Sequence, residues 1–332
     1  MTCSFFDSAW RTWAGRFGAF WLATALASAN AFDLQAHRGG RGLAPENTLA
    51  AFAHAMDLGV TTLELDIGLS ADNVVVISHD TALNPDHTRD ASGAWLAATG
   101  PKIRALTLAE LQRYDVGRLN PASDYGKPFA GQAPRDGERV PTLAALFDLV
   151  KARGDTRVRF NIETKIDPTR PDDTAAPEPM VRALLAEIER AGMGPRVTVQ
   201  SFDWRTLALV GQLAPQLPRA YLTSPRTLRD ARWTSGASAA DQGLSTPRFV
   251  ASMARAGADG KAPVIWSPAF ADLSAAQVQD AHAIGLTVMP WTVNRRADMA
   301  RLLDMGVDGL ITDFPDVLLA LMRERGMTPP SR

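Results

Sequence analysis

Two histidines and three carboxylates are the residues of this sequence best suited to chemistry, because they stand at or near the ends of short β-like runs. The set is His37, Glu64, Asp66, His79 and Glu163. Glu64 and Asp66 lie two apart in one run, so both point to the same side of the strand. Carboxylates on an inward face are costly unless they are paired or bind a metal ion. In a chain with one cysteine and five histidines, three such carboxylates favour a hard divalent cation, Ca²⁺ or Mg²⁺, over zinc.

Eight β-like runs alternate with helix-like stretches, which predicts a parallel α/β fold. The expected strands are Leu34 to His37, Thr62 to Ile67, Arg159 to Glu163, Val197 to Ser201, Ala220 to Leu222, Val264 to Trp266, Thr287 to Trp291 and Gly309 to Thr312. The expected helices include Leu49 to Leu58, Leu143 to Ala152, Pro179 to Ala191, Trp204 to Leu213, Ala275 to Ile284, Ala297 to Met305 and Pro315 to Arg325.

Eight such units fit a closed (β/α)₈ TIM barrel. The competing architecture is a doubly wound open sheet, which usually carries a Gly-rich phosphate turn after its first strand, and no G-x-G-x-x-G or Walker-type loop occurs here. The barrel therefore accounts better for the pattern. It also explains why the candidate residues follow strands, since the carboxyl ends of barrel strands form the active site.

One run breaks the alternation of strands and helices. Val74 to Ser78 follows the second strand after only a few residues, whereas parallel neighbours need a crossover of about a dozen or more. We expect this run to be the return arm of a β-hairpin or an extended loop. The next sixty or so residues are rich in Gly, Pro, Asn and Asp and are too many for an ordinary loop. We therefore expect an inserted segment, about residues 82–140, that caps the active-site end after the second strand.

Composition excludes some partners. The chain has 332 residues, 46% of them hydrophobic, so it can bury a large core. Its formal net charge is −1, which provides neither a polyanion-binding surface nor a basic stripe for a membrane. Nucleic acid is therefore not expected as a partner, and nothing in the sequence indicates an obligate protein partner.

The N-terminus has the pattern of a secretory signal. Two arginines precede an apolar run, Phe17 to Ala27, that is too short to span a bilayer comfortably, and small residues follow as two A-x-A patterns. We expect residues 1–29 to be a signal peptide cleaved near residue 29 or 31, with the barrel over residues 32–326. Cleavage would remove Cys3, the only cysteine, and export would make the protein periplasmic or secreted. A retained anchor or an amphipathic N-terminal helix is the alternative.

The sequence resembles the glycerophosphodiester phosphodiesterase domain in a series of short motifs. They are His37-Arg38-Gly39, Pro45-Glu46-Asn47-Thr48, Glu64-Leu65-Asp66, His79-Asp80, Glu163-Thr164-Lys165, Gln200-Ser201-Phe202, Trp291-Thr292-Val293-Asn294 and Thr312-Asp313-Phe314-Pro315. These motifs keep the family's order and cover nearly the whole mature chain. The resemblance implies a metal-dependent barrel enzyme that cleaves a small glycerophosphodiester, or a related lipid head group, to an alcohol and glycerol 3-phosphate.

The resemblance also implies roles for individual residues. Carried over motif by motif, His37 and His79 become the acid/base pair, Glu64, Asp66 and Glu163 the ligands of one divalent cation, and Arg38 and Lys165 the contacts to phosphate oxygens. Glu46, nine residues after His37, would join the metal shell or hydrogen-bond a catalytic group. These residue types suit the chemistry, because the cation and arginine offset the charge of the diester and imidazole can exchange protons near neutral pH.

The family resemblance further implies how the reaction proceeds. The neighbouring glycerol hydroxyl attacks phosphorus to give a cyclic phosphate, and water then opens the ring with the two histidines in reversed roles. Either histidine can begin as the base.

Other side chains in or near these motifs have both a functional and a structural interpretation. Trp291 and Phe202 could wall the alcohol side of the substrate, or they could pack within the barrel. Asp80 could orient the neighbouring histidine or cap its turn, and Asp313 could cap the last helix or touch the ligand. For His87, in the inserted segment, a surface loop is the favoured interpretation.

Three alternative classes stay open. A metal-independent phosphatidylinositol-type phospholipase C would share the barrel and histidine pair but would not need three carboxylates. A sphingomyelinase-type phospholipase D would share the carboxylates, but the motif at Pro45 to Thr48 favours the phosphodiesterase. A non-catalytic binding barrel would be expected to lack a histidine or a carboxylate, and none is missing. Leu83-Asn84-Pro85 resembles a branch of the family that also takes intact phospholipids, so we expect the inserted segment to decide between deacylated and intact lipid.

Overall fold

The computed structural model describes residues 32–256 and 262–328. The expected signal peptide, residues 1–29 with its cleavage sites near 29 and 31, lies outside the described residues, as does Cys3. Among the described helices, none is both long enough and apolar enough to cross a membrane.

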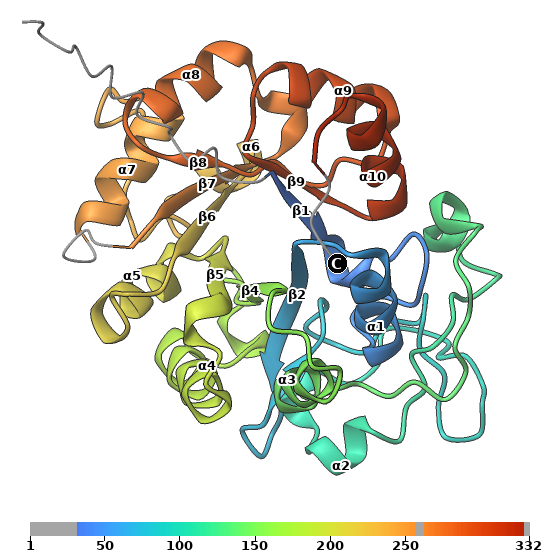
Figure 1. Cartoon of the computed structure of the whole chain (residues 1–332). Helices are drawn as coiled ribbons and strands as arrows, with labels where there is room; N and C mark the ends of the chain where they lie inside the picture. The colour runs from blue at the N-terminus through green and yellow to red at the C-terminus, as the bar shows by residue number, and fades with distance from the viewer. Residues whose placement is uncertain (1–31, 257–261, 329–332) are drawn as a thin grey trace, which may run out of the picture. The chain divides into compact units, whose positions relative to one another are not determined.

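Eight parallel strands form the barrel that the sequence predicts (Figure 1). In chain order they are β1 (Asp33–Ala36), β2 (Thr62–Leu69), β4 (Arg159–Thr164), β5 (Val197–Ser201), β6 (Arg219–Thr223), β7 (Val264–Pro268), β8 (Thr287–Val288) and β9 (Gly309–Thr312). Ladder pairing runs from β8 through β7, β6, β5, β4, β2 and β1 to β9. The circle is nearly closed, because the amide of Asp308 donates to the carbonyl of Val288 over 3.1 Å and that of Ile311 to Pro290 over 3.1 Å.

Two strands end earlier than expected, for local reasons. β8 ends at Val288 rather than at Trp291, because Pro290 has no amide hydrogen to donate to a ladder. β1 ends at Ala36, and His37 begins a short 3₁₀ turn, η1 (His37–Gly39). This turn moves His37 off the strand and onto the rim of the barrel.

The expected hairpin is confirmed. β3 (Val75–Ile77) pairs antiparallel with β2, with Ile67 opposite Ile77 and Leu69 opposite Val75. Asn73, in the turn between the strands, has a φ of 60°, a left-handed conformation that Asn tolerates better than most residues. The hairpin lengthens β2 and delivers His79 two residues beyond the end of β3.

Helices cover the outside of the barrel (Figure 1). They are α1 (Leu49–Leu58), α3 (Leu143–Ala152), α4 (Pro177–Ala191), α5 (Trp204–Leu213), α7 (Thr246–Ala256), α8 (Ala275–Ala283), α9 (Arg296–Asp304) and α10 (Pro315–Glu324). A further short helix, α6 (Pro225–Leu228), directly follows β6. Along β2 the apolar Leu63, Leu65 and Ile67 are fully buried in the main core, while Glu64 and Asp66 take the opposite face, as period-two alternation requires. The β2 carboxylates therefore point into the barrel.

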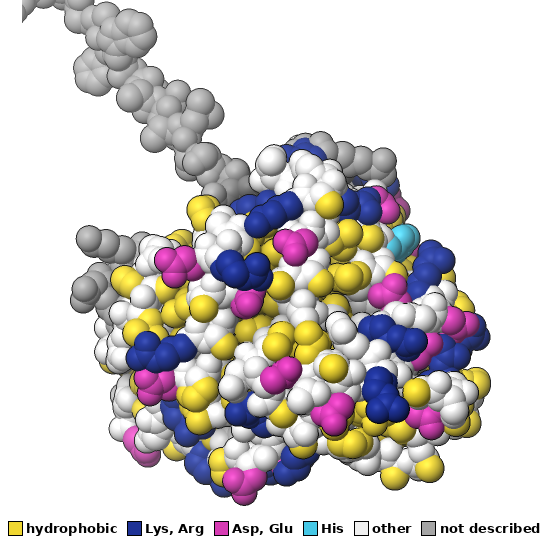
Figure 2. Space-filling model, turned by 90° about the horizontal axis from the view of Figure 1, so that it is seen from below, with side chains coloured by type: hydrophobic (Ala, Val, Ile, Leu, Met, Phe, Trp, Pro, Cys, Tyr) yellow, Lys and Arg dark blue, Asp and Glu magenta, His cyan; other side chains and the backbone are white. Residues whose placement is uncertain are grey.

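The segment between β3 and α3 contains little regular structure and has an apolar cluster of its own. It includes η2 (Ile103–Ala105), α2 (Leu108–Leu111) and η3 (Asp124–Phe129). Its cluster consists of Val76, Leu83, Ile103, Leu111, Val116 and Val140, separate from the barrel core. Since this small core packs on β3, the segment is anchored beside the site and can supply side chains to it. On the face drawn in Figure 2, acidic and basic side chains are interspersed rather than gathered by sign.

Candidate active site

The turn after β1 places the backbone of Arg38 against a carboxylate of β2. Arg38 has a φ of 52°, a left-handed conformation that is uncommon outside glycine and is often found at functional sites. Its amide donates to Oε2 of Glu64 over 2.9 Å. Gly39 has a φ of 81°, and a Cβ at this position would lie 2.8 Å from Cβ of Ala51. Glycine is therefore required for the turn to lie this close to α1.

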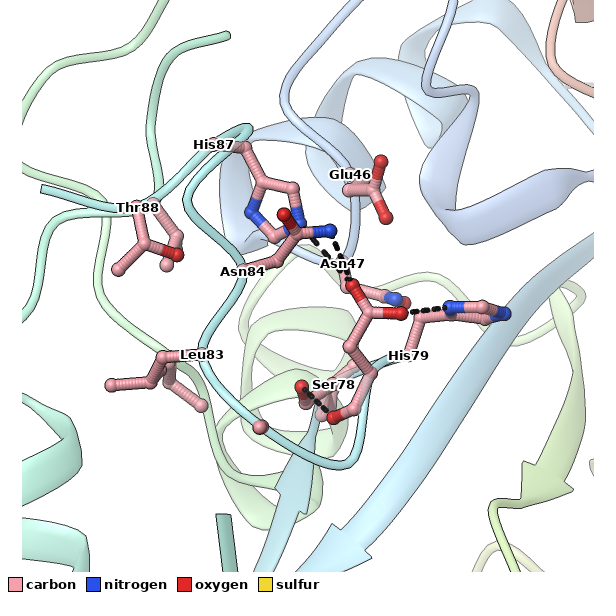
Figure 3. Close-up of a pocket in the computed structure, with 13 residues that line it drawn as sticks. Glu46, Asn47, Ser78, His79, Leu83, Asn84, His87 and Thr88 are labelled. Carbon is pink, nitrogen blue, oxygen red and sulfur yellow. Dashed lines mark hydrogen bonds and ion pairs between the residues drawn. The ribbon is translucent and has the colours of Figure 1, made fainter. Parts of the chain in front are cut away.

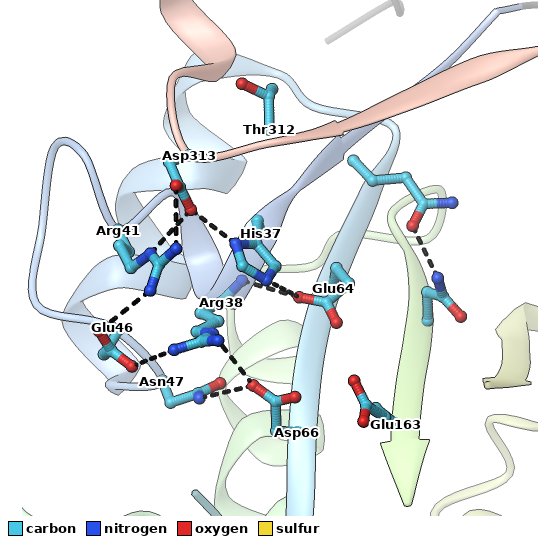
Figure 4. Close-up of polar contacts among 12 residues, drawn as sticks. His37, Arg38, Arg41, Glu46, Asn47, Glu64, Asp66, Glu163, Thr312 and Asp313 are labelled. Carbon is cyan, nitrogen blue, oxygen red and sulfur yellow. Dashed lines mark hydrogen bonds and ion pairs between the residues drawn. The ribbon is translucent and has the colours of Figure 1, made fainter. Parts of the chain in front are cut away.

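His37 is held by a buried aspartate that is distant along the chain but follows the neighbouring strand, β9 (Figure 4). Its Nδ1 lies 2.6 Å from Oδ1 of Asp313, whose carboxylate is fully buried. Burial alone would raise the pKa of Asp313, but His37 and Arg41 outweigh burial and hold that pKa well below its usual range. An ionised carboxylate can only accept, so Nδ1 carries the proton and Nε2 is free, 4.0 Å from Glu64. Asp313 makes no side-chain cap on α10, so the helix-cap interpretation is wrong.

Two further residues fix Asp313. Arg41 donates to Oδ1 over 2.9 Å through Nε and to Oδ2 over 3.1 Å through Nη2. Asn294 donates to Oδ2 over 2.6 Å. With His37 as the fourth donor, both carboxylate oxygens are saturated, and the imidazole ring has one orientation.

Three carboxylates meet on the inner face of β2 and β4. Asp66 is directly opposite Glu163 in the parallel ladder, and Glu64, Asp66 and Glu163 offer oxygen atoms that all lie within 4.8 Å of one another. Burial and the charge of Asp66 raise the pKa of Glu64 well above its usual range. Burial is also the main cause that raises the pKa of Glu163 to about 7. Mutual repulsion of this kind is what a bound cation relieves.

The neighbours of these carboxylates leave room for a cation. Gln200 donates to Oε1 of Glu64 over 2.6 Å, and Asn47 donates to Oδ2 of Asp66 over 3.0 Å. The other Asp66 oxygen, Oδ1, is buried without a hydrogen bond. An orphaned carboxylate oxygen among hard oxygen donors fits Ca²⁺ or Mg²⁺. The three residues predicted as ligands are thus brought together in one buried group.

The cationic candidates lie against this group. Lys165 donates to Oε1 of Glu163 over 2.7 Å and lies 3.6 Å from Oδ1 of Asp66. Although burial opposes it, the charge of Lys165, with smaller contributions from other cations, holds the pKa of Asp66 well below its usual range. Arg38 donates to Oε1 of Glu46 over 2.7 Å, and its Nε lies 3.4 Å from Asp66. Glu46 therefore lies outside the group of three carboxylates, on the far side of Arg38.

His79 enters from the loop after β3 (Figure 3). Its Nδ1 lies 2.8 Å from Oδ1 of Asp80, and Asn84 donates to Oδ2 of Asp80 over 2.7 Å. Burial and the charge of Lys165 lower the pKa of His79 to about 4. His87 was expected in a surface loop, and this is wrong: its side chain is 17% exposed and its Nε2 lies 3.8 Å from Asp80. The inserted segment packs this histidine into the small pocket drawn in Figure 3.

A wider cleft of about 670 Å³ opens beside His79. Glu163, Lys165, Phe202 and Trp291 are among the residues that line it. The rings of Phe202 and Trp291 meet edge to face with centroids 5.2 Å apart, and the indole of Trp291 donates to the carbonyl of Ser267 over 2.9 Å. Both aromatic residues thus reach the cleft, where they form a fixed apolar wall.

Sequence reasoning missed several residues that contact the predicted ones. They are Arg41, Asn47, Tyr125 and Gln200. Asp313 was singled out in the sequence, but its contact with His37 was not predicted. Asn47 and Gln200 lie inside the quoted motifs, and their place in those motifs was the available signal. Arg41 and Tyr125 follow no motif, and only the three-dimensional structure identifies them.

Comparisons with known proteins identify the family of this chain. The chain matches the model of the glycerophosphoryl diester phosphodiesterase family over residues 37–317. It is 30% identical over 291 residues to a glycerophosphodiester phosphodiesterase of Caldanaerobacter subterraneus subsp. tengcongensis, covering 88% of this chain and 98% of that protein. It is 30% identical over 286 residues to one of Bacillus subtilis, covering 85% and 83%.

Solved structures give the same result for the fold. A Silicibacter pomeroyi protein with a provisional assignment as a glycerophosphoryl diester phosphodiesterase superposes with a TM-score of 0.80 at 36% identity, covering 90% of this chain and 95% of that one. An Oleispira antarctica phosphodiesterase, solved with its product sn-glycerol-3-phosphate, superposes with a TM-score of 0.61 at 23% identity, covering 88% and 96%. The chain belongs to the glycerophosphoryl diester phosphodiesterase family.

Proposed function

We propose that this chain hydrolyses glycerophosphodiesters to an alcohol and sn-glycerol 3-phosphate, with a divalent cation and with His37 and His79 as the acid/base pair. The observation that carries the proposal is that each histidine has its Nδ1 against an aspartate, at 2.6 Å for His37 and 2.8 Å for His79. A carboxylate partner fixes the tautomer and leaves Nε2 of each ring to exchange a proton. The names of the relatives support the same reaction.

Arg38 and Lys165 are proposed to bind the non-bridging phosphate oxygens. Arg38 is buried, and its Nε lies 3.4 Å from Asp66 without a hydrogen bond, so this is the guanidinium donor that we assign to the phosphate. Lys165 and His79 line the same cleft. Two cations on the phosphate stabilise the negative charge that grows as the new P–O bond forms.

The two histidines exchange protons at either end of the reaction. One Nε2 accepts the proton of the attacking hydroxyl, and the other histidine, in its protonated form, donates to the leaving oxygen, which is too basic to depart as an alkoxide. Asp313 and Asp80 stabilise the imidazolium form of the ring that each contacts. When water then opens the cyclic phosphate, the roles reverse: the histidine that gave up its proton accepts one from water, and the other donates to the departing ring oxygen, which returns both rings to their first state.

Glu64, Asp66 and Glu163 are proposed to hold one Ca²⁺ or Mg²⁺. Such an ion would supply Lewis acidity that offsets the negative charge of the phosphate during the reaction. The cleft wall of Phe202 and Trp291 is proposed to pack on the apolar side of the alcohol or glycerol moiety. The substrate is then held between a polar face with the charged groups and an apolar face.

The first test is to measure glycerol 3-phosphate released from glycerophosphocholine and glycerophosphoglycerol, with Ca²⁺, with Mg²⁺ and with EDTA, alongside His37→Ala. We expect metal-dependent release that is lost in the variant. Release unaffected by EDTA would refute the metal proposal. Absence of release under every condition would refute the proposed function for small diesters.

We also propose that the protein is exported, on the strength of its N-terminal pattern of arginines, an apolar run and A-x-A sequences. Expression of the full-length chain followed by N-terminal sequencing of the accumulated protein tests this proposal. A mature N-terminus at residue 30 or 32 supports export, and a protein that keeps residues 1–29 contradicts it.

A further inference from the structure

Tyr125 of the inserted segment reaches into the proposed site from outside the barrel. It lies in η3, and its hydroxyl donates to Oε2 of Glu46. The same hydroxyl accepts from Nη1 of Arg41 over 2.8 Å and, at 3.5 Å, from Nη1 of Arg38. One phenol oxygen thus joins two arginines and a glutamate, three groups that all come from the first turn after β1 and the loop behind it.

The two arginines contact different parts of the proposed site. Arg38 lies between Glu46 and Asp66 and carries the phosphate-binding role. Arg41 makes the paired hydrogen bonds that fix Asp313, the partner of His37. One residue, Arg38, therefore separates Tyr125 from the proposed phosphate position. Two residues, Arg41 and Asp313, separate it from the acid/base residue His37.

The inserted segment holds Tyr125 rigidly. Ser123 accepts from the amide of Tyr125 over 3.1 Å and donates to Asp86 over 2.5 Å. The guanidinium of Arg41 lies over the ring of Phe129 at 4.8 Å, and Gln132 donates to the carbonyl of Arg41 over 2.7 Å. The segment is thus attached to the first turn at several points around the tyrosine.

The protonation states define the direction of these hydrogen bonds. Burial and the charge of Glu46 raise the pKa of Tyr125 well above its usual range, so its hydroxyl keeps its proton. Although burial opposes it, the charge of Arg38, with smaller contributions from other neighbours, lowers the pKa of Glu46 to about 2, so this carboxylate only accepts. The hydroxyl therefore donates one hydrogen bond to Glu46 and accepts one from each arginine, which uses its full hydrogen-bonding capacity.

We propose that Tyr125 is a positioning residue through which the inserted segment sets both Arg38 and the chain Arg41–Asp313–His37 for catalysis. Glu46 can pair with either arginine, at 2.7 Å for Arg38 and 3.9 Å for Arg41. The hydroxyl occupies its second oxygen and separates the two guanidinium groups. Without the hydroxyl, that oxygen is free to draw one of the arginines away from its present contact.

This inference rests on the proposed function, and its test is Tyr125→Phe with Tyr114→Phe as the matched control. Phe keeps the ring that packs 6.0 Å from His87 and 6.0 Å from Phe129. Tyr114 lies in the same inserted segment and packs on its apolar cluster; among the described residues, none hydrogen-bonds its hydroxyl. Each variant loses one hydroxyl, so the two differ only in what the lost hydroxyl contacts in the wild type.

We expect Tyr125→Phe to raise KM for glycerophosphocholine and to lower kcat, so that kcat/KM falls roughly ten- to hundredfold, the effect of losing hydrogen bonds to charged groups. Tyr114→Phe is expected to stay within about twofold of the wild type. A Tyr125→Phe variant with a lower Tm but wild-type kcat and KM, measured where both proteins are folded, would show a purely structural role and overturn the inference.

Calorimetric titration with glycerol 3-phosphate gives a second readout that needs no turnover. Weaker binding to Tyr125→Phe than to the control supports the positioning role even if hydrolysis is not observed, in which case only the proposed function fails. Equal binding and equal turnover overturn the inference while the function stands. A wild-type protein that neither binds nor hydrolyses overturns both.

Discussion

Asp313→Asn is expected to reduce turnover because no orientation of an amide can replace the carboxylate. Oδ1 accepts from His37 at 2.6 Å and from Nε of Arg41 at 2.9 Å. Oδ2 accepts from Nη2 of Arg41 at 3.1 Å and from Asn294 at 2.6 Å. An asparagine must place its NH₂ group at one of these two positions, where it meets two donors. Either choice breaks the network that orients the imidazole.

The magnitude follows from the bond to His37. The buried carboxylate stabilises the imidazolium form, and hydrogen bonds to charged groups contribute about 1.5–3 kcal/mol. Since each 1.36 kcal/mol is about tenfold in rate, we expect kcat to fall roughly ten- to hundredfold. KM should change less, because Arg38 and Lys165 keep their own contacts to the phosphate.

The assay is steady-state hydrolysis of glycerophosphocholine at saturating metal, with unfolding midpoints for both proteins. Asp308→Asn is the matched control, since Asp308 pairs with His282 at 2.9 Å in a half-exposed contact away from the cleft. That variant should keep the wild-type kcat. If Asp313→Asn turns over at the wild-type rate, the assignment of His37 as an acid/base residue held by Asp313 is wrong.

Three further predictions concern the metal, the pH dependence of stability and the pairing of β1 with β9. Asp66→Asn should abolish the rise in Tm that Ca²⁺ or Mg²⁺ produces in the wild type, because it removes one of three carboxylate ligands; a full rise in the variant, measured by calorimetry, would place the ion elsewhere. Glu46→Gln should destabilise the protein at neutral pH by on the order of 3 kcal/mol, because the pKa of Glu46 falls from 4.5 to about 2 on folding. A lowered pKa stabilises above the unfolded value, so the difference should shrink as pH falls from about 4.5 toward 2 in denaturant titrations; a difference independent of pH would contradict it. Gly309→Ala should prevent folding or lower Tm by many degrees, since a Cβ there would lie 2.2 Å from the carbonyl oxygen of Asp33; a normal melting curve would show that β1 and β9 can separate.

Much of the fold follows from local pattern. Each barrel strand is a short apolar or alternating run bounded by Gly, Pro or polar residues, so its place along the chain is set by neighbouring residues. The helices α1, α3 and α5 begin and end as expected, because a Thr or Asp caps each N-terminus. Among the barrel strands, β8 departs most from its expected bounds, and Pro290 is the sequence feature that explains it.

The partners of the site residues were less accessible to sequence reasoning. His37 and Asp313 are 276 positions apart, and they meet because β1 and β9 are neighbours in a closed barrel. A barrel prediction permits this contact but does not select Asp313 over helix capping. Tyr125 lies in an irregular segment without periodicity, so no pattern places its hydroxyl 2.8 Å from Arg41. His87 was misjudged for the same reason.

The charges of the site form one continuous network that calls for a cation. Ion pairs of 4.0 Å or less connect His37, Arg38, Arg41, Glu46, Glu64, Asp66, Glu163, Lys165 and Asp313. Five carboxylates stand against three permanently cationic side chains, which leaves an excess of two negative charges in a mostly buried volume. Burial, together with the charge of neighbouring carboxylates, raises the pKa values of Glu64 and Glu163 in this network. One divalent cation would neutralise the network, and the resulting site would accept an anionic diester without a net electrostatic penalty.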